Sequence, residues 1–435
     1  MSDQMETEVN PVDKNWLQRL KNESWEAELL VSAVAIFAIL KSFSGIDWLL
    51  TKFIDYLNPN QYLVAYAIIV SGYLAVGVLA AMFSIHFALR AYWIGLVGLN
   101  SVFPDYSLED SAYSPIYTEK TLQMLPKLSV SITKIDELCS VTFSAAFSIM
   151  LIYLNFTVIA TVYLILYNLA KDVVPEWILL IPLGLFIGYI VYGSILTSIA
   201  NTKKFRSHEK IQELYFLYSK WGAKILYGPF PKSILQISMI FGSNYKRKKG
   251  LIKMILFMLF IGTIFGGVQL VRSNYDYLIN YDVPVDSSKK HAYYYADNNV
   301  GTDFLLAPEI NAGTIKNRVL QLFIPIFKHE KTIFEAKCAI PDFPTFQLPD
   351  DTERQKRRDT YLACYAKNQS VTINGRTVEV SFLKSDHPHT GQFGIVTYID
   401  LDSLSNGTHT LGVEKIFEGQ NRRKWTIPFY ISAKN

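Results

Sequence analysis

The apolar residues of the chain gather in long runs, all of which lie before residue 272. A hydrocarbon layer about 30 Å thick is crossed by about 20 helical residues, and several runs reach that length. The first is the weakest, because Lys41 and Asp47 lie inside it, and the third is longer than a perpendicular crossing needs. The sequence predicts a helical transmembrane domain over 29–271, with five spans at about 29–50, 62–89, 139–170, 177–199 and 251–271.

From residue 272 to the end, the pattern changes to short alternating runs separated by Asn, Gly, Asp and Pro. This pattern is typical of β-strands with one buried face. Asn374-Gly375 and Asn406-Gly407 each stand between two such runs, which predicts two tight hairpins. We therefore expect an all-β, immunoglobulin-like sandwich, a class that more often binds or supports than catalyses. The best strands are 319–328, 378–383, 394–401, 409–415 and 425–431.

The distribution of Lys and Arg predicts the orientation of the chain. These residues are concentrated in the segments 1–28, 90–138 and 200–250, and cytoplasmic segments are the ones that retain positive charge. Five spans then place the domain 272–435 on the opposite, exoplasmic side. Residues 1–28 are polar and acidic and do not resemble a cleavable signal peptide. We expect a multi-pass protein of a bacterial cytoplasmic (inner) membrane with a periplasmic C-terminal domain.

Two cytoplasmic segments contain further apolar sequence. Residues 91–103 predict an interfacial or re-entrant helix, and a sixth span is the alternative, although it would bury His86 and Arg90 in lipid. In 209–226, apolar residues recur at helical spacing with Lys on other faces, which predicts an amphipathic helix at the membrane surface. A kink or break at Pro126 is expected in a third helix, over 119–138.

A basic cluster precedes the fifth span and consists of Lys246, Arg247, Lys248 and Lys249. Basic residues at a membrane surface attract anionic lipid with about 1 kcal/mol per charge. The simpler interpretation is positive charge that stops transfer of the chain. In both cases the lipid bilayer is the first partner that the sequence predicts.

Polar residues within or at the ends of the first three spans are the candidates for a transport path. They are Asp47, His86, Arg90 and Asn155. Ionisable or polar groups in membrane helices are often functional, and Asn155 is the deepest of the four. Transport proteins usually add paired charges or broken helices in repeated halves, and the sequence contains no internal repeat. A channel or transporter component is therefore the alternative function.

Small residues spaced by four recur in the spans, for example Gly184 with Gly188 and Gly262 with Gly266. Such spacing lets two helices approach closely. Packing within one chain is the favoured interpretation, and a homo-oligomer is the alternative.

Two cysteines of the outer domain, Cys338 and Cys364, predict a disulfide bond, since exoplasmic space permits one. Closing a loop of that size is worth about 3 kcal/mol in the chain-entropy model. Two buried free thiols are the alternative. The segment 350–359 between them is expected to be a solvated charged loop. The tract 386–389 holds two His and one Asp, for which a surface loop is favoured over a metal site, and the aromatic run 293–295 is assigned to interface packing rather than a ligand groove.

Composition agrees with a membrane protein. Only 18% of the 435 residues are charged, and the mean hydropathy is +0.17, whereas soluble domains carry about 25% charged residues. A net charge of +4 gives no reason to expect nucleic-acid binding. No common nucleotide, dinucleotide, zinc-protease or hydrolase motif occurs, which excludes the commonest enzyme classes but not enzymes in general. No cofactor is expected, and a membrane-embedded enzyme that uses His86 or Asp47 is the least favoured hypothesis. The sequence predicts a membrane anchor for an outer domain used in interaction, assembly or sensing, with a periplasmic protein or glycan as partner.

Overall fold

The computed structural model describes residues 11–106, 112–171, 173–226, 228, 231–244, 249–280, 292–297, 303–337, 351–416 and 422–432. The chain divides into two compact units. The first combines Met1–Asp47 with Ala67–Asn274, and the second combines Trp48–Tyr66 with Tyr275–Asn435. The turn between the first two long helices therefore groups with the C-terminal domain.

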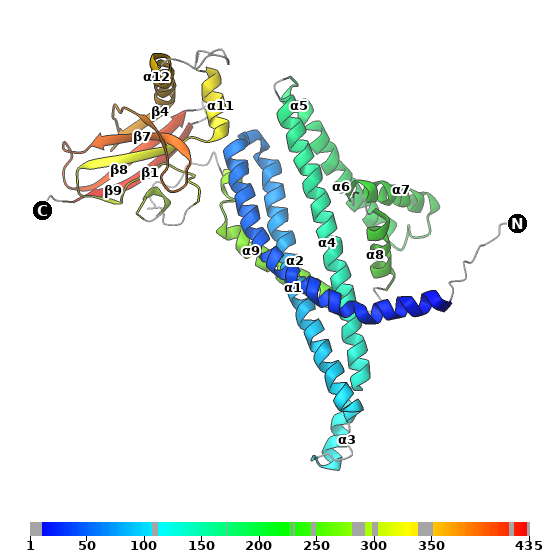
Figure 1. The fold of residues 1–435 in the computed structure, drawn as a ribbon. Helices are drawn as coiled ribbons and strands as arrows, with labels where there is room; N and C mark the ends of the chain where they lie inside the picture. The colour runs from blue at the N-terminus through cyan, green and yellow to red at the C-terminus, as the bar shows by residue number, and fades with distance from the viewer. Residues whose placement is uncertain are drawn as a thin grey trace. The chain divides into compact units, whose positions relative to one another are not determined.

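Long apolar helices dominate the first unit (Figure 1). Five stretches are long and apolar enough to cross a membrane: Ser24–Tyr56, Pro59–Val102, Pro115–Ala170, Trp177–Ala200 and Lys253–Arg272. The five predicted spans are thus confirmed as helices. They lie in α1 (Pro11–Tyr56), α2 (Tyr62–Val102), α4 (Leu128–Ala170), α5 (Glu176–Leu179) with α6 (Ile181–Ala200), and α9 (Lys249–Arg272); the shorter helices are α3 (Pro115–Met124), α7 (Glu209–Leu226) and α8 (Pro231–Asn244).

Helix α2 continues without a break to Val102, so the expectation of a re-entrant or separate helix over 91–103 is wrong. Its 41 residues give a length of about 60 Å, and the 43 residues of α4 give about 65 Å. Both lengths exceed the thickness of a bilayer, and both helices extend toward α3 (Figure 1). The predicted break at Pro126 is confirmed, because α3 ends at Met124 and α4 begins at Leu128.

Glycines allow α2 and α9 to cross in close contact. A side chain at Gly77 would collide with the backbone of Gly262 and Gly266, and side chains at these two would collide with the backbone of α2. A Cβ at Gly184 or Gly188, in contrast, would meet no atom of the described residues within 4 Å. The pair on α9 therefore packs helices within the chain, whereas the pair on α6 faces open space in the described part of the protein.

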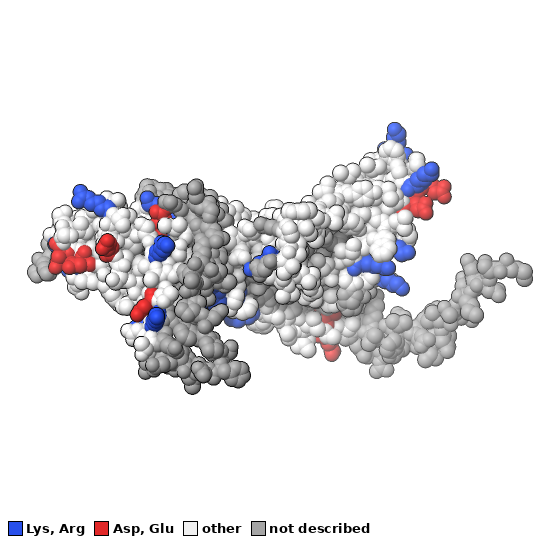
Figure 2. Space-filling model, turned by 90° about the horizontal axis from the view of Figure 1, so that it is seen from above, with Lys and Arg blue, Asp and Glu red and all other residues white. Residues whose placement is uncertain are grey.

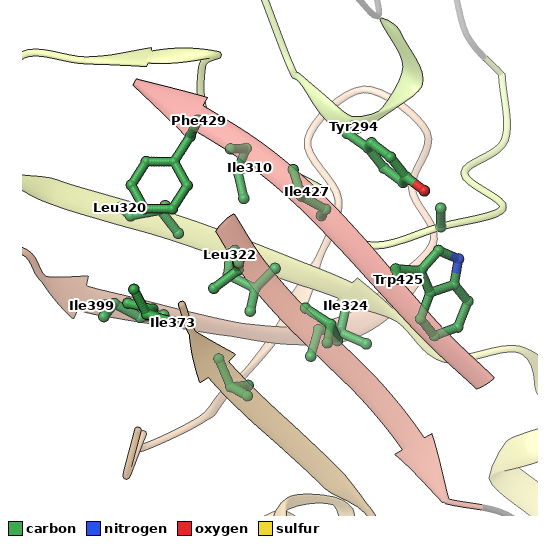
Figure 3. Packing of buried hydrophobic residues seen from close by; sticks show 14 of the residues in the cluster. Tyr294, Ile310, Leu320, Leu322, Ile324, Ile373, Ile399, Trp425, Ile427 and Phe429 are labelled. Carbon is green, nitrogen blue, oxygen red and sulfur yellow. The ribbon is translucent and has the colours of Figure 1, made fainter. Parts of the chain in front are cut away.

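Two β-sheets form the second unit. One has the strand order β1-β3-β7-β6 and the other β2-β9-β8-β4-β5, with β2 parallel to β9 and the other described pairs antiparallel. The strands are β1 (Glu309–Ile310), β2 (Thr314–Ile315), β3 (Val319–Pro325), β4 (Gln369–Ile373), β5 (Arg376–Thr377), β6 (Leu383–Asp386), β7 (Phe393–Asp400), β8 (Gly407–Ile416) and β9 (Arg422–Ile431). Side chains from both sheets form one core, including Leu322 of β3, Ile399 of β7 and Ile427 of β9 (Figure 3). The β-rich domain is confirmed as a two-sheet structure.

One of the two predicted hairpins is confirmed. Asn374 and Gly375 have φ of 50° and 80°, and Ile373 pairs with Arg376 across this turn. The second prediction is wrong, because β7 and β8 belong to different sheets. Leu401 is fully buried after β7, and the chain crosses from one sheet to the other before Gly407.

The all-β expectation fails where two helices, α11 (Lys328–Lys337) and α12 (Asp351–Lys367), lie between β3 and β4. The segment 351–359 is helical rather than a loop, because Tyr361 and Tyr365 of the same helix pack on the core. The predicted strand 378–383 begins only at Leu383, although Val378 and Val380 pack against the core. The remaining short helices are α10 (Tyr277–Asn280) and the 3₁₀ turns Pro59–Gln61, Pro104–Tyr106 and Ala292–Tyr294.

Candidate functional site

The polar residues proposed for a transport path fall at three separate places. The hydroxyl of Tyr73 donates to Asp47. Asn155 Nδ2 donates to the carbonyl of Ile225, 2.9 Å away. Only His86 and Arg90 lie together, one helical turn apart on α2. The four residues therefore do not gather in one site, and the lining of a path by them stays a prediction.

Arg90 is the centre of a buried charge cluster within the first unit. Its side chain is 1% exposed and contacts two carboxylates from two other helices. Arg90 donates to Asp136 Oδ1 of α4 at 2.7 Å and to Glu28 Oε2 of α1. Hydrogen bonds between a guanidinium and a carboxylate are strong where water is excluded. Arg90 thus connects α1, α2 and α4.

His86 extends the cluster toward α1 and is fully buried. Its Nδ1 lies 2.7 Å from Ser32 Oγ, and that hydroxyl donates to the carbonyl of Glu28 at 2.7 Å. The hydroxyl of Ser32 thus lies between the carbonyl of Glu28 and the imidazole. The other ring nitrogen, Nε2, lies 3.7 Å from Glu28 Oε2. The imidazole is therefore held between a hydroxyl and a carboxylate of the same helix.

Aromatic rings cover the cluster. The guanidinium of Arg90 lies 5.1 Å from the ring centre of Trp93, which in turn lies 5.9 Å from Trp25. Tryptophans are enriched where helices leave the hydrocarbon layer, so the cluster fits the end of the spans. The paired charges of the cluster can hold three helices in one relative register, and a change in the charge of one member would disturb that register. Among the described residues, no group of three or more His, Cys, Asp or Glu could hold a metal ion.

The sequence indicates His86 and Arg90 but not their partners. Glu28 and Asp136 lie in segments that the charge pattern assigns to the cytoplasm, where a carboxylate needs no explanation. The spacing of four between His86 and Arg90 places both on one helical face, and a buried arginine requires carboxylates nearby. The sequence therefore indicates that Arg90 needs carboxylates nearby, but it does not indicate which carboxylates these are.

A second candidate site is the joint between the α1–α2 turn and α11, both within the second unit. The backbone nitrogen of Lys328 donates to Asp55 Oδ1 at 3.0 Å, and Lys328 Nζ lies 3.7 Å from Asp55 Oδ2. His329 Nδ1 lies 3.2 Å from the carbonyl oxygen of Asp55. A carboxylate at the first turn of a helix is favoured by the helix dipole. Asp55 therefore secures the turn to the beginning of α11.

A buried ion pair fixes α11 to the sheets. Lys415 Nζ lies 2.8 Å from Glu330 Oε2 and donates to the carbonyl of Pro325 at 2.6 Å, and the two side chains are 1% and 4% exposed. Glu330 also accepts from the backbone nitrogen of Phe327 at 3.0 Å. Burial lowers the pKa of Lys415, and the charge of Glu330 opposes that shift. Because a buried charge is stable only when paired, α11 has one favoured position on the domain.

Other predicted features of the C-terminal domain have structural roles. Tyr294 and Tyr295 are fully buried in the core of the two sheets, whereas the prediction for 293–295 was packing at the membrane interface. His387 is 7% exposed, so the expected surface loop is wrong for this residue. Its Nε2 lies 2.9 Å from Glu309 Oε1, and its Nδ1 accepts from the backbone nitrogen of Thr390 at 3.2 Å. These bonds fasten the loop to β1.

Some predicted sites lie outside the described residues. Cys364 lies on α12, but Cys338 is not described, so their disulfide bond stays a prediction. Cys139 is buried and free. Lys246, Arg247 and Lys248 are not described, and nor is the side chain of Lys249, so their contact with anionic lipid also stays a prediction.

Replacing Arg90 with glutamine should lower the free energy of unfolding of the helical unit by about 3 kcal/mol or more, because two carboxylates would remain without their counter-charge. Thermal unfolding of the purified full-length protein, followed by tryptophan fluorescence, measures this effect. Glu26→Gln is the matched control, because Glu26 is exposed two residues from Glu28. If Arg90→Gln unfolds at the same temperature as the control, the cluster does not stabilise the helices.

Acidification should weaken the joint through His329. Burial lowers the pKa of His329 below its usual value of 6.5, so the native protein keeps this imidazole neutral where the unfolded chain is protonated. Stability therefore decreases as the pH falls below about 6.5 and levels off below the native pKa. Proteolysis of the α1–α2 turn between pH 7.5 and 5 measures the effect, and His329→Gln should flatten the profile. An unchanged profile in the variant would assign the pH dependence to another group.

Searches with protein-family models, curated proteins and solved structures found no match to this chain.

Proposed function

We propose that this is a multi-pass protein of a bacterial cytoplasmic membrane, with a periplasmic C-terminal domain that serves in interaction, assembly or sensing. We further propose that the domain passes its state to the membrane helices through the α1–α2 turn. The observation that carries this proposal is the joint formed by Asp55 with Lys328 and His329.

The contacts of the joint are more directed than anchoring of the domain alone would require. A flexible connection at the end of α9 would be enough to anchor a domain. The turn instead makes directed hydrogen bonds to α11, and Tyr62 of α2 packs edge-on against His329 with ring centres 6.5 Å apart. Helix α11 is in turn fixed by the buried pair of Lys415 and Glu330. A displacement of α11 would therefore act on the ends of α1 and α2.

Helices α1 and α2 extend without interruption from the joint to the charge cluster. From Asp55 to Glu28, α1 rises about 40 Å. A continuous helix transmits a shift or rotation along its axis better than a loop does. Glu28 and Arg90 are thus positioned to register a change made at the other end of the helices.

The periplasmic location and the immunoglobulin-like class are part of the proposal. The concentration of Lys and Arg in 1–28, 90–138 and 200–250 supports the orientation. Two sheets around one core support the class, whereas the parallel pairing of β2 with β9 and the helical insertion depart from it. A protein or glycan is the proposed partner, since Tyr398 and Leu383 expose 57% and 56% of their surface.

A channel or transporter component with a path among α1, α2 and α4 is the alternative. It has less support in this form, because its candidate residues lie at three places and each has a hydrogen-bond partner.

The orientation is tested by labelling single cysteines with a membrane-impermeant reagent in intact cells, in a background without native cysteines. Ser403→Cys should react, because it is exposed in the C-terminal domain, whereas exposed Ser207→Cys should react only after the membrane is opened. The reverse pattern would place the C-terminal domain in the cytoplasm and contradict the proposal.

Transmission of a structural change from the joint to the charge cluster is tested by hydrogen exchange of the full-length protein in lipid nanodiscs. Asp55→Asn should accelerate exchange several-fold in 48–66 and also in 24–32, near the charge cluster. Asp402→Asn, an exposed carboxylate of the same domain, is the matched control and should change neither segment. Acceleration confined to 48–66 would show that the joint is structural and does not communicate with the cluster.

A further inference from the structure

Helix α7 begins beside the end of α6 and reaches the middle of that helix. Near its start, Gln212 Nε2 donates to the carbonyl of Ala200 at 2.9 Å. Two turns later, the rings of Tyr218 and Tyr189 stack with centres 4.6 Å apart. Each of these tyrosine hydroxyls donates to the other residue's carbonyl, at 3.0 and 3.3 Å. Gly193 leaves room for the ring of Tyr218.

The end of α7 is held by α4. Asn155 Nδ2 donates to the carbonyl of Ile225 in the last turn of α7, which would otherwise lack a partner. Gly228 follows with φ of 54°, and a side chain there would collide with Asn155. Helix α8 then starts at Pro231 and lies against both α7 and α4. The two helices form a hairpin with its turn beside Asn155.

This hairpin enters the depth of the candidate spans. By helical rise, Tyr189 lies about 18 Å from Trp177 and about 17 Å from Ala200, the two ends of its span. Asn155 lies about 24 Å from Cys139 and about 22 Å from Ala170 on α4. Tyr218 in the middle of α7 and Ile225 near its end therefore lie beside the middle of these two apolar stretches.

The exposed face of α7 carries two lysines among large apolar side chains, which include Phe216 and Leu217. Lys220, Trp221 and Lys224 are exposed, and Lys224 Nζ lies 4.9 Å from the ring centre of Trp221. No carboxylate of the described residues lies within 4 Å of either lysine. Glu213, the nearest acidic residue before them on α7, is two turns from Lys220. Lys and Arg side chains lie at the end of the helical unit, and Asp or Glu side chains lie beside some of them (Figure 2).

Unpaired ammonium groups are unfavourable in hydrocarbon, and a hairpin that enters a membrane is tolerated where it is buried in protein or lines a water-filled cavity. We propose that the exposed face of α7 lines a water-accessible vestibule that reaches partway across the membrane and binds small inorganic anions at Lys220 and Lys224. Two ammonium groups beside an aromatic ring suit a monovalent anion of the halide class. This inference does not depend on the proposed role of the outer domain.

The test uses quenching of Trp221 fluorescence in the full-length protein, reconstituted in nanodiscs of zwitterionic lipid. The Trp221 signal is the difference between the native protein and Trp221→Phe. Iodide should quench it several-fold more strongly than caesium, because the two lysines concentrate anions. Lys220→Gln with Lys224→Gln should remove that preference and leave quenching by neutral acrylamide unchanged. Lys203→Gln with Lys204→Gln, a lysine pair outside α7, is the matched control and should keep the preference.

Three results would overturn the proposal. Quenching by brominated acyl chains without quenching by iodide would place the face in lipid. Protection from iodide, acrylamide and brominated lipid together would show that protein covers the face, such as a second copy of this chain. Equal quenching by iodide and caesium would show a water-filled space without anion binding. An unchanged acrylamide quenching constant in the lysine variants shows that Trp221 keeps the exposure that it has in the native protein.

Discussion

A buried arginine cannot stay charged at the end of a helix bundle unless carboxylates reach it, and this constraint organises the helical unit. Arg90 takes one carboxylate from α1 and one from α4. Both contacts are possible only in one relative register of the three helices, because the guanidinium donates in fixed directions. The desolvation of such a group offsets most of the gain from pairing, so the cluster contributes specificity more than net stability.

The C-terminal domain also contains a buried charge that is paired. Lys415 is fully enclosed by Glu330, the carbonyl of Pro325 and the ring of Phe327, and this pairing determines where α11 begins. The first residues of α11 are then the ones that receive Asp55. The ion pair of Lys415 and Glu330 therefore positions the contact of α11 with Asp55. Asp55 lies in the segment Trp48–Tyr66, which belongs to the second unit. The α1–α2 turn is thus part of the second unit, together with the β-sheets and α11.

The sequence pattern correctly predicted the features that depend on residues close together in the chain. The five helical spans followed from apolar length, and the turn at Asn374-Gly375 followed from the positive φ that these residues accept. The turn expected at Asn406-Gly407 failed because the burial of Leu401, a tertiary effect, sends the chain to the other sheet. Helix α12 was missed because its charged first half hides the apolar residues in its second half. For the charge cluster, His86 and Arg90 were visible in the sequence, but Glu28 and Asp136 became recognisable only when the helices were placed side by side.

Asn155 shows how a polar residue of a long apolar helix can have a structural role. Its amide donates to the carbonyl of Ile225 in the last turn of α7, a group that the helix itself leaves without a donor. The bundle of α1, α2 and α4 is closed by paired charges, whereas the group of α4, α6 and α7 leaves Lys220 and Lys224 exposed. If a solute enters the membrane domain, the distribution of charge favours the side of α7 over the region between α1, α2 and α4. Helices α7 and α8 are thus held on α4 and α6 by hydrogen bonds and ring stacking that the amphipathic pattern of 209–226 did not indicate.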